Sequence, residues 1–262
     1  MFVDGSLIAQ YFYLGVFLLI AASLIAGYVD AIAGGAGLIL VPACMLVGMP
    51  PQLALGQEKL VSTIGTIAAI KNFIKAKSII YQILPIGIVS ALVGAFIGAR
   101  AILLFPSEVI EYIIFLFLPI GLLATLFKGK LVGNAQMGEV KKSAITVFVT
   151  CLLVGFYDGF FGPGTGSLFI IALFLINRLS LLQASATSKI FNFSSNIGAF
   201  VAFAMAGQMA LLIGIPMILA NLLGNHLGSM HAIKSDGVII KKVLMITVGL
   251  MMATLAYRFL VA

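Results

Sequence analysis

The sequence has little charge and no tryptophan: Asp, Glu, Lys and Arg together make up 9% of its 262 residues. Soluble globular proteins carry about 25% charged residues and about 45–50% apolar ones. The apolar share here is 62% and the mean hydropathy is +1.22. This composition excludes a water-soluble domain, a disordered chain and a disulfide-linked scaffold. It predicts an all-α polytopic membrane protein, in which each spanning helix uses about 20 apolar residues.

Residues that usually build metal or catalytic sites are also scarce. Cysteine and histidine occur twice each. Cys44 and Cys151 lie within apolar runs, and His226 and His231 have no third ligand at a suitable spacing. A nucleophile elbow, a phosphate-binding loop and a paired-cysteine cluster are missing from the sequence. We therefore expect no enzyme, no metal and no cofactor, and we interpret both histidines as packing or interface residues.

Basic residues are unevenly placed along the chain. The net charge is +7, but most cations lie in short gaps between apolar runs, which is typical of the orientation signal of a membrane protein. A long basic arm is lacking, so we expect no nucleic acid partner. Residues 1–10 contain no Lys or Arg, and a secretory signal peptide is therefore not expected.

Two apolar runs are too short to cross a bilayer, at 38–48 and 167–176. Each follows a glycine-rich break, at 34–37 in the first half and at 162–166 in the second. Short segments interrupted by glycine at corresponding positions of two halves are typical of secondary transporters. The remaining apolar runs lie at 11–33, 52–74, 79–104, 108–127, 143–161, 180–206, 208–232 and 238–261.

The longest polar stretch divides the chain near its middle. We expect a first transmembrane repeat over 1–127, a cytoplasmic connecting loop over 128–142 and a second transmembrane repeat over 143–262. Three patterns recur in the same order and at nearly the same spacing. They are Gly27–Asp30 with Gly155–Asp158, Ala54–Lys59 with Ala184–Lys189, and the pair Gly94 and Gly98 with the pair Gly224 and Gly228.

Loop charge indicates that the two repeats are inverted. Lys71, Lys75 and Lys77 crowd one gap of the first half, whereas the equivalent gap at Gly207 is uncharged. The next gap of the second half is basic instead, so equivalent loops are expected on opposite sides of the membrane. Inversion needs an odd number of crossings per half. Each half would then contain one glycine-broken helical hairpin and three long membrane helices; eight simple spans with parallel repeats are the alternative.

The motifs around the breaks carry a family resemblance. The first half contains GYVDAIAGGAGL at 27–38 and GMPPQLALG at 48–56, and the second contains GFYDGFFGPGTGS at 155–167 and ATSKIFNF at 186–193. Together they resemble the sulfite exporter TauE/SafE family across almost the whole chain. The resemblance implies a multi-pass carrier of the bacterial inner membrane that moves sulfite, organosulfonates or related anions, commonly outward. One departure is Gln57-Glu58-Lys59, where the family usually has a Thr-Asn-Lys type of sequence.

The breaks and two symmetric lysines are the candidate substrate site. Helix N-termini at a break favour an anion, and glycine lets the backbone approach it closely. A lysine could neutralise the anion, or it could form a salt bridge to Asp30 or Asp158. Neighbouring residues of one helix do not face each other, so no pairing of Lys59 with Glu58 is expected. The substrate-binding candidates are Gly34, Gly35, Gly37, Lys59, Gly162, Gly164, Thr165, Gly166, Lys189, Asn192 and Asn196.

Acidic residues at the breaks have two readings. Asp30, Glu58 and Asp158 could couple transport to protons, or they could serve as caps and structural ion pairs. A polar stripe follows Lys189, with Asn192, Ser195 and Asn196 on one helix face and Ser194 turned away. Ser62, Thr63 and Thr66 are its counterparts after Lys59.

These features predict a secondary transporter that works by alternating access around a midplane site. Its expected partners are a small sulfur-containing anion and the lipid bilayer, with protons as a coupling ion and a homo-oligomer left open. The alternatives are a carrier of another small anion, a membrane enzyme and a non-transporting assembly partner.

Overall fold

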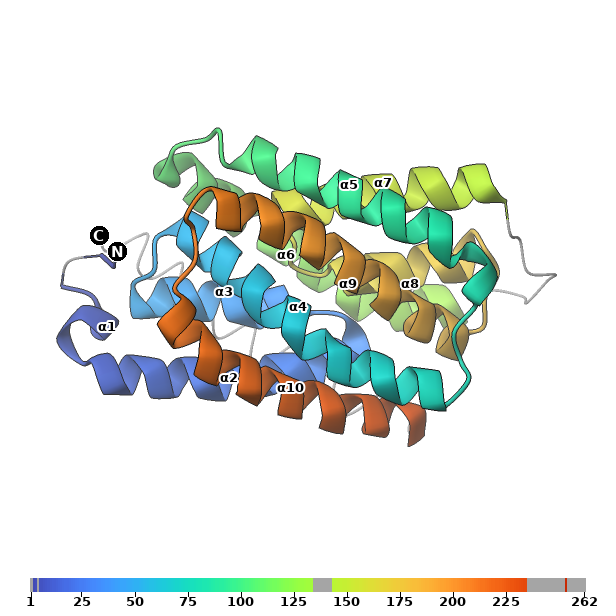
Figure 1. Ribbon diagram of the computed structural model, residues 1–262, viewed down its shortest axis with the longest axis horizontal. Coiled ribbons are helices and arrows are strands. Elements are labelled where there is room, and N and C mark those ends of the chain that lie inside the picture. The colour runs from blue at the N-terminus through green and yellow to red at the C-terminus, as the bar shows by residue number, and fades with distance from the viewer. Residues whose placement is uncertain (1, 4, 134–142, 235–252, 254–262) are drawn as a thin grey trace.

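The computed structural model describes residues 2–3, 5–133, 143–234 and 253, and within them it is helical without strands. The predicted all-α class is therefore confirmed. Figure 1 shows the helices gathered into one elongated bundle. They are α1 (Leu7–Gln10), α2 (Phe12–Ala33), α3 (Ala36–Val47), α4 (Pro51–Lys75), the 3₁₀ turn η1 (Tyr81–Ile83), α5 (Leu84–Ile102), α6 (Ser107–Gly133), α7 (Ala144–Phe160), α8 (Thr165–Leu175), α9 (Leu181–Met205) and α10 (Leu211–Lys234).

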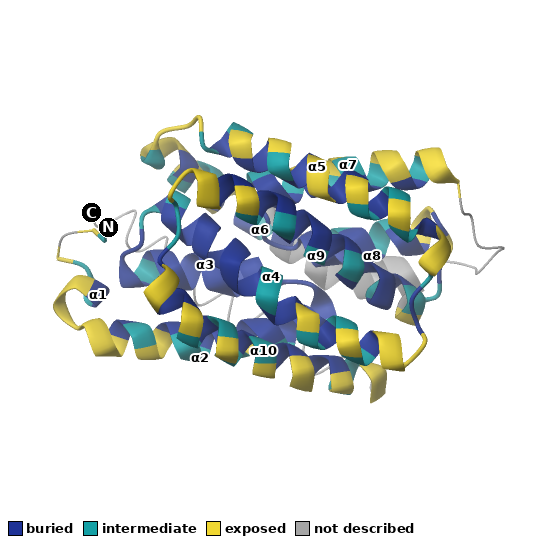
Figure 2. Ribbon diagram, viewed as in Figure 1, coloured by how far each residue is buried: buried dark blue, intermediate teal, exposed yellow. Residues whose placement is uncertain are grey.

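The outer surface of the bundle is apolar, as a bilayer requires. Among the residues that the structure describes, three segments are long and apolar enough to cross a membrane by length and composition: Phe12–Ala33, Tyr81–Ile102 and Leu211–Lys234. Large side chains such as Phe17 and Leu219 are more than 60% exposed on their outer faces. In Figure 2 the exposed residues lie on the outer helices, whereas α3 and α8 are largely buried. This inside-out distribution fits a polytopic membrane protein.

Small residues bring the outer helices into close contact. α5 packs against α7, and α2 packs against α10. A β-carbon placed on Gly98 of α5 would lie 2.1 Å from the Phe156 carbonyl oxygen of α7. On α10, a β-carbon at Gly228 would lie 2.3 Å from the Tyr28 carbonyl oxygen of α2. Backbones this close are typical of glycine-mediated helix packing in membranes, where burial of apolar surface gives little driving force.

One expected boundary differs in the structure. α6 continues to Gly133, so positions 128–133 of the expected connecting loop are helical. The polar residues there mark where the apolar stretch ends, not where the helix ends, since lysine is a good helix former. Positions 134–142 and the last apolar run, 238–261, lie almost entirely outside the described residues. The division into two repeats stays a prediction.

Candidate transport site

Each glycine-rich break separates two packed helices. α2 ends at Ala33, Gly34 takes a left-handed conformation with φ of 75°, and α3 begins at Ala36. α7 ends at Phe160, and α8 begins at Thr165 after Gly162 and Gly164, which also have positive φ values, of 91° and 86°. Glycine is needed at these turns because a side chain strongly disfavours positive φ.

The two breaks lie directly against each other. The Ser167 amide donates a hydrogen bond of 3.3 Å to the Gly34 carbonyl oxygen, and the Ser167 hydroxyl donates to the Ala33 carbonyl oxygen. A β-carbon on Gly34 would lie 2.5 Å from the Gly166 carbonyl carbon, so no side chain fits between them. The end of α2 is thus joined to the start of α8, although their sequences lie far apart.

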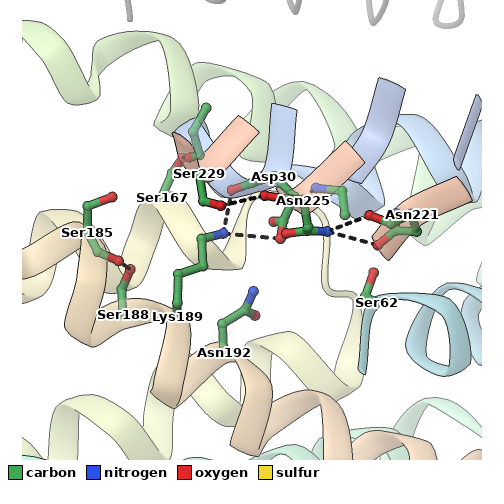
Figure 3. Close-up of polar contacts among 12 residues, drawn as sticks. Asp30, Ser62, Ser167, Ser185, Ser188, Lys189, Asn192, Asn221, Asn225 and Ser229 are labelled. Carbon is green, nitrogen blue, oxygen red and sulfur yellow. Dashed lines mark hydrogen bonds and ion pairs between the residues drawn. The ribbon is translucent and has the colours of Figure 1, made fainter. Parts of the chain in front are cut away.

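Both symmetric lysines form buried ion pairs that connect the two halves of the sequence. Lys59 Nζ on α4 lies 2.8 Å from Asp158 Oδ1 on α7, and Lys189 Nζ on α9 lies 3.1 Å from Asp30 Oδ2 on α2. All four side chains are at most 3% exposed. Lys189 also donates to the Asp30 carbonyl oxygen, and Figure 3 shows both contacts. Of the alternatives for the lysines, salt bridges to Asp158 and Asp30 are the contacts present.

Lys59 has more partners than the sequence indicated. Its Nζ lies 3.0 Å from Glu58 Oε2 and donates to Asn196 Oδ1 at 3.2 Å. The expectation that Glu58 and Lys59 do not pair was wrong. Adjacent side chains leave a helix in different directions at their β-carbons, but two long chains can curve back toward one another. Glu58 also accepts a hydrogen bond of 2.8 Å from Ser62, one turn further along α4.

The two aspartates have different surroundings despite their equivalent positions. Asp30 Oδ1 accepts a long contact of 3.4 Å from the Ala36 amide at the start of α3. Asp158 instead accepts a hydrogen bond of 2.6 Å from the Ser195 hydroxyl on α9. The Asp30 carboxylate therefore contacts a helix N-terminus at its break, whereas the Asp158 carboxylate contacts the side chains of Lys59 on α4 and Ser195 on α9.

A narrow polar cavity of about 10 Å³ lies between the breaks. That volume has room for about one water molecule, whereas ligand pockets enclose about 300–1,000 Å³, so the cavity must widen to admit a solute. Most of the predicted site residues line it. They are Gly34, Gly37, Gly162, Gly164, Thr165, Gly166, Asn192 and Asn196, together with Asp30, Glu58 and Asp158.

Three predicted site residues do not line this cavity: Gly35, Lys59 and Lys189. Gly35 has a φ of −140°, which needs no glycine, and a β-carbon there would meet the Leu38 side chain. The lysine ammonium groups are turned into the carboxylates. Ala36 is a lining residue that the sequence did not identify, and Ser62, which the sequence placed only among the polar residues after Lys59, also lines the cavity. The signal for Ser62 was its position four residues after Glu58, on the same helix face.

Asn192 lines the cavity with a side-chain amide that is available for hydrogen bonding. The residue is 6% exposed, and among the described residues its side-chain amide has no hydrogen-bond partner, although its backbone carbonyl oxygen accepts from Ser195. Figure 3 shows its amide pointing from α9 toward the Lys189–Asp30 contact. An amide that has no protein partner and lines a cavity is available to hydrogen-bond a ligand or water. The Asn196 amide nitrogen is also free of protein acceptors in the described region, because only its oxygen is bonded to Lys59.

Comparison with known proteins identifies the family. Residues 19–255 match the model of the sulfite exporter TauE/SafE family. The chain belongs to the TauE/SafE family. A probable membrane transporter protein from Sinorhizobium, ORF9, is 38% identical over 90% of this chain and 89% of its own. Another from Haemophilus influenzae is 33% identical over 92% and 94%, and YfcA of Escherichia coli is 32% identical over 93% and 90%. No solved structure matches.

Membership in the TauE/SafE family settles the function class. The three relatives named above are all probable membrane transporters, and the family is a transporter family. The chain is therefore a membrane transporter and not an enzyme.

Polar residues of this TauE/SafE chain outside the cavity hold helices together. Asn225 Nδ2 donates to Asn221 Oδ1 at 2.9 Å, and Asn221 Nδ2 donates to the Ser23 carbonyl oxygen on α2 at 3.0 Å. His231 Nδ1 lies 2.8 Å from the Tyr28 hydroxyl. His226 contacts Asn72 on α4 in a similar way. Both histidines thus join neighbouring helices, and the described residues contain no cluster that could hold a metal.

Proposed function

We propose that this protein is a secondary transporter that exports a small sulfur-containing anion, such as sulfite or an organosulfonate. Substrate would bind in the cavity between the two breaks and reach each side of the membrane in turn. The observation that carries this proposal is the unpartnered Asn192 amide in a polar cavity that residues of both halves line. The family name points to the same class of substrate.

Neutral donors suit a sulfo group in this setting. The amide groups of Asn192 and Asn196 can donate to anionic oxygens without adding a second buried charge. Backbone at the starts of α3 and α8 lies close by, and helix N-termini favour negative charge. The two lysines contribute positive potential from behind the cavity wall, because Asp30 and Asp158 bind them directly. Amide and backbone donors would therefore make the direct contacts.

An inverted repeat would give the transporter its two alternating states. The two halves contact each other through equivalent pairs of helices. α2 of the first half packs on α10 of the second, and its counterpart α7 of the second half packs on α5 of the first. The ion pairs follow the same pattern: Lys59 of the first half pairs with Asp158 on α7, and Lys189 of the second half pairs with Asp30 on α2. Figure 1 shows α4 starting at the left end of the bundle and its counterpart α9 starting at the right. These relations support a two-fold axis through the cavity, with each pair of short helices forming a re-entrant hairpin.

Positive charge orients the bundle in the bacterial inner membrane. In Figure 1 the end of α4, with Lys75, and the end of α10, with Lys234, lie at the same right-hand end. The α9–α10 connection around Gly207 lies at the opposite end. By the positive-inside rule the right-hand end is cytoplasmic.

Single cysteines test this orientation. In a Cys44→Ser, Cys151→Ser background, Lys75→Cys should react with an impermeant thiol reagent only in inside-out vesicles. Gly207→Cys should react only in right-side-out vesicles, since nothing lies within 4 Å of a β-carbon there to shield it. Labelling of both positions from one side would contradict the inverted arrangement.

Flux into sealed proteoliposomes tests the transport function. The purified wild type should exchange internal for external sulfite, and a panel of thiosulfate, sulfoacetate, taurine and sulfate would define the preferred anion. Protein-free liposomes give the background. The proposal predicts saturable exchange of at least one sulfur-containing anion. Exchange restricted to carboxylates or phosphate would assign the cavity to another small anion, and no saturable exchange of any anion would overturn the proposal.

A further inference from the structure

The buried cluster around the cavity holds more carboxylates than cations. Asp30, Glu58 and Asp158 line the cavity, while Lys59 and Lys189 are the lysines paired with them. Each aspartate has a lysine from the other half of the chain. Glu58 has only a share of Lys59, which already contacts Asp158 at 2.8 Å. Glu58 is therefore the surplus carboxylate of the cluster.

The second half of the chain has no such group. Aligning Lys59 with Lys189 places Ser188 opposite Glu58. Ser188 donates its hydroxyl to the Ser185 carbonyl oxygen and does not line the cavity. The two symmetric ion pairs can thus form without a glutamate at this position. A carboxylate that only the first half contributes is therefore expected to have a role other than pairing the two halves.

An ionised Glu58 opposes binding of an anion. Three negative charges and two positive ones leave the cavity with an excess of one negative charge, and buried charges interact strongly because water screens them poorly. A singly charged oxoanion entering beside Glu58 would double that excess. A proton on Glu58 cancels this excess of negative charge and provides an O–H group that can donate to the anion. Lys59 then keeps its contacts with Asp158 and Asn196.

We propose that Glu58 is the proton-binding residue of the cavity and that one proton binds together with one anion. The inference rests on the proposed anion transport. The proton comes from solvent and forms an O–H bond with a carboxylate oxygen of Glu58. For a monoanion, the loaded cavity then has the same net charge as the empty cavity with Glu58 ionised, so both can reorient at equal electrostatic cost.

Within the described residues, few charged or titratable groups lie near Glu58. Lys59 on its own helix and Asp158 on α7 contact or face it, and the Cys44 thiol on α3 is close enough to interact electrostatically. The Asp30–Lys189 pair from α2 and α9 borders the same cavity, with Asp30 as a lining residue. Each aspartate is held by its own lysine and by a further donor, from Ser195 or from Ala36. Glu58 lacks a lysine of its own and is therefore the group that must gain the proton.

Proton uptake on anion binding tests this role. Calorimetry of sulfite binding in two buffers of different protonation enthalpy gives the number of protons taken up. Glu58→Gln keeps the size and a donor but cannot titrate. Sulfite itself titrates near neutral pH, and the Glu58→Gln variant measures that contribution alone. The wild type should take up about one proton more per sulfite than this variant. Glu108→Gln, which removes an exposed acid of α6, is the matched control and should behave like the wild type.

A second probe removes the titration of the ligand. The affinity of the wild type for isethionate, whose sulfonate stays ionised, should fall about tenfold per pH unit once Glu58 is ionised, and that of Glu58→Gln should stay constant. If Glu58→Gln does not fold, Glu58→Ser replaces it, since the second half has serine at this position. Equal proton uptake and equal pH dependence in wild type and variant would overturn the role of Glu58 while leaving anion transport intact. Absence of any anion binding by the wild type would overturn both proposals.

Discussion

Replacing Lys189 by Gln should destabilise the protein by about 3–5 kcal/mol, because it leaves the Asp30 carboxylate buried without its cation. Asp30→Asn alone should cost a similar amount by leaving the ammonium group unpaired. The double variant Lys189→Gln, Asp30→Asn should recover most of the loss, because two neutral amides can bond to each other. Thermal unfolding in detergent measures the effect, and a thiol-reactive dye can report it through the buried Cys44 and Cys151.

A mismatched double variant is the control for this rescue. Asp158 pairs with Lys59 and not with Lys189, so Lys189→Gln combined with Asp158→Asn should be no more stable than Lys189→Gln alone. Asp158→Asn by itself should be the milder aspartate change, because Glu58 still accompanies Lys59. Rescue of Lys189→Gln by Asp158→Asn but not by Asp30→Asn would contradict the pairing between halves.

The ion pairs also show how far the sequence could lead. Charged residues inside apolar runs have few explanations, so the sequence singled out Asp30, Asp158, Lys59 and Lys189. The structure brings these four residues together in two ion pairs. The pairing of each lysine with the aspartate of the other half could not be predicted. It depends on how the two halves pack, and no local pattern encodes that arrangement.

Local rules failed where side-chain reach or backbone conformation decided the outcome. The spacing rule for helices concerns β-carbons, and it missed the contact of Lys59 with Glu58 because both side chains are long. Gly35 was counted with its neighbours as a binding residue, but only Gly34 of that pair takes the left-handed conformation and lines the cavity. Composition correctly located the polar stretch after 127, yet could not show that α6 continues through its first residues.

Replacing Asn192 should weaken anion binding, which is the second large effect that we expect. Leucine has nearly the size of asparagine but donates no hydrogen bond. Since the Asn192 amide has no protein partner in the described region, Asn192→Leu removes no internal hydrogen bond and should fold normally. A hydrogen bond to a charged group is worth about 1.5–3 kcal/mol, so the variant should bind the anion roughly 10- to 150-fold more weakly.

Ser194→Ala is the matched control on the same helix. Ser194 is also buried, at 4% exposure, but its hydroxyl donates to the Ile190 carbonyl oxygen and it does not line the cavity. It should therefore keep wild-type affinity for the anion.

The most direct test of the central claim, that the anion occupies the cavity between the two breaks, is sulfite exchange by these two variants and the wild type in matched proteoliposomes. We predict that Asn192→Leu raises the KM for sulfite at least about tenfold at an unchanged unfolding temperature, while Ser194→Ala exchanges sulfite like the wild type. Wild-type KM and kcat for Asn192→Leu would place the anion elsewhere in the protein.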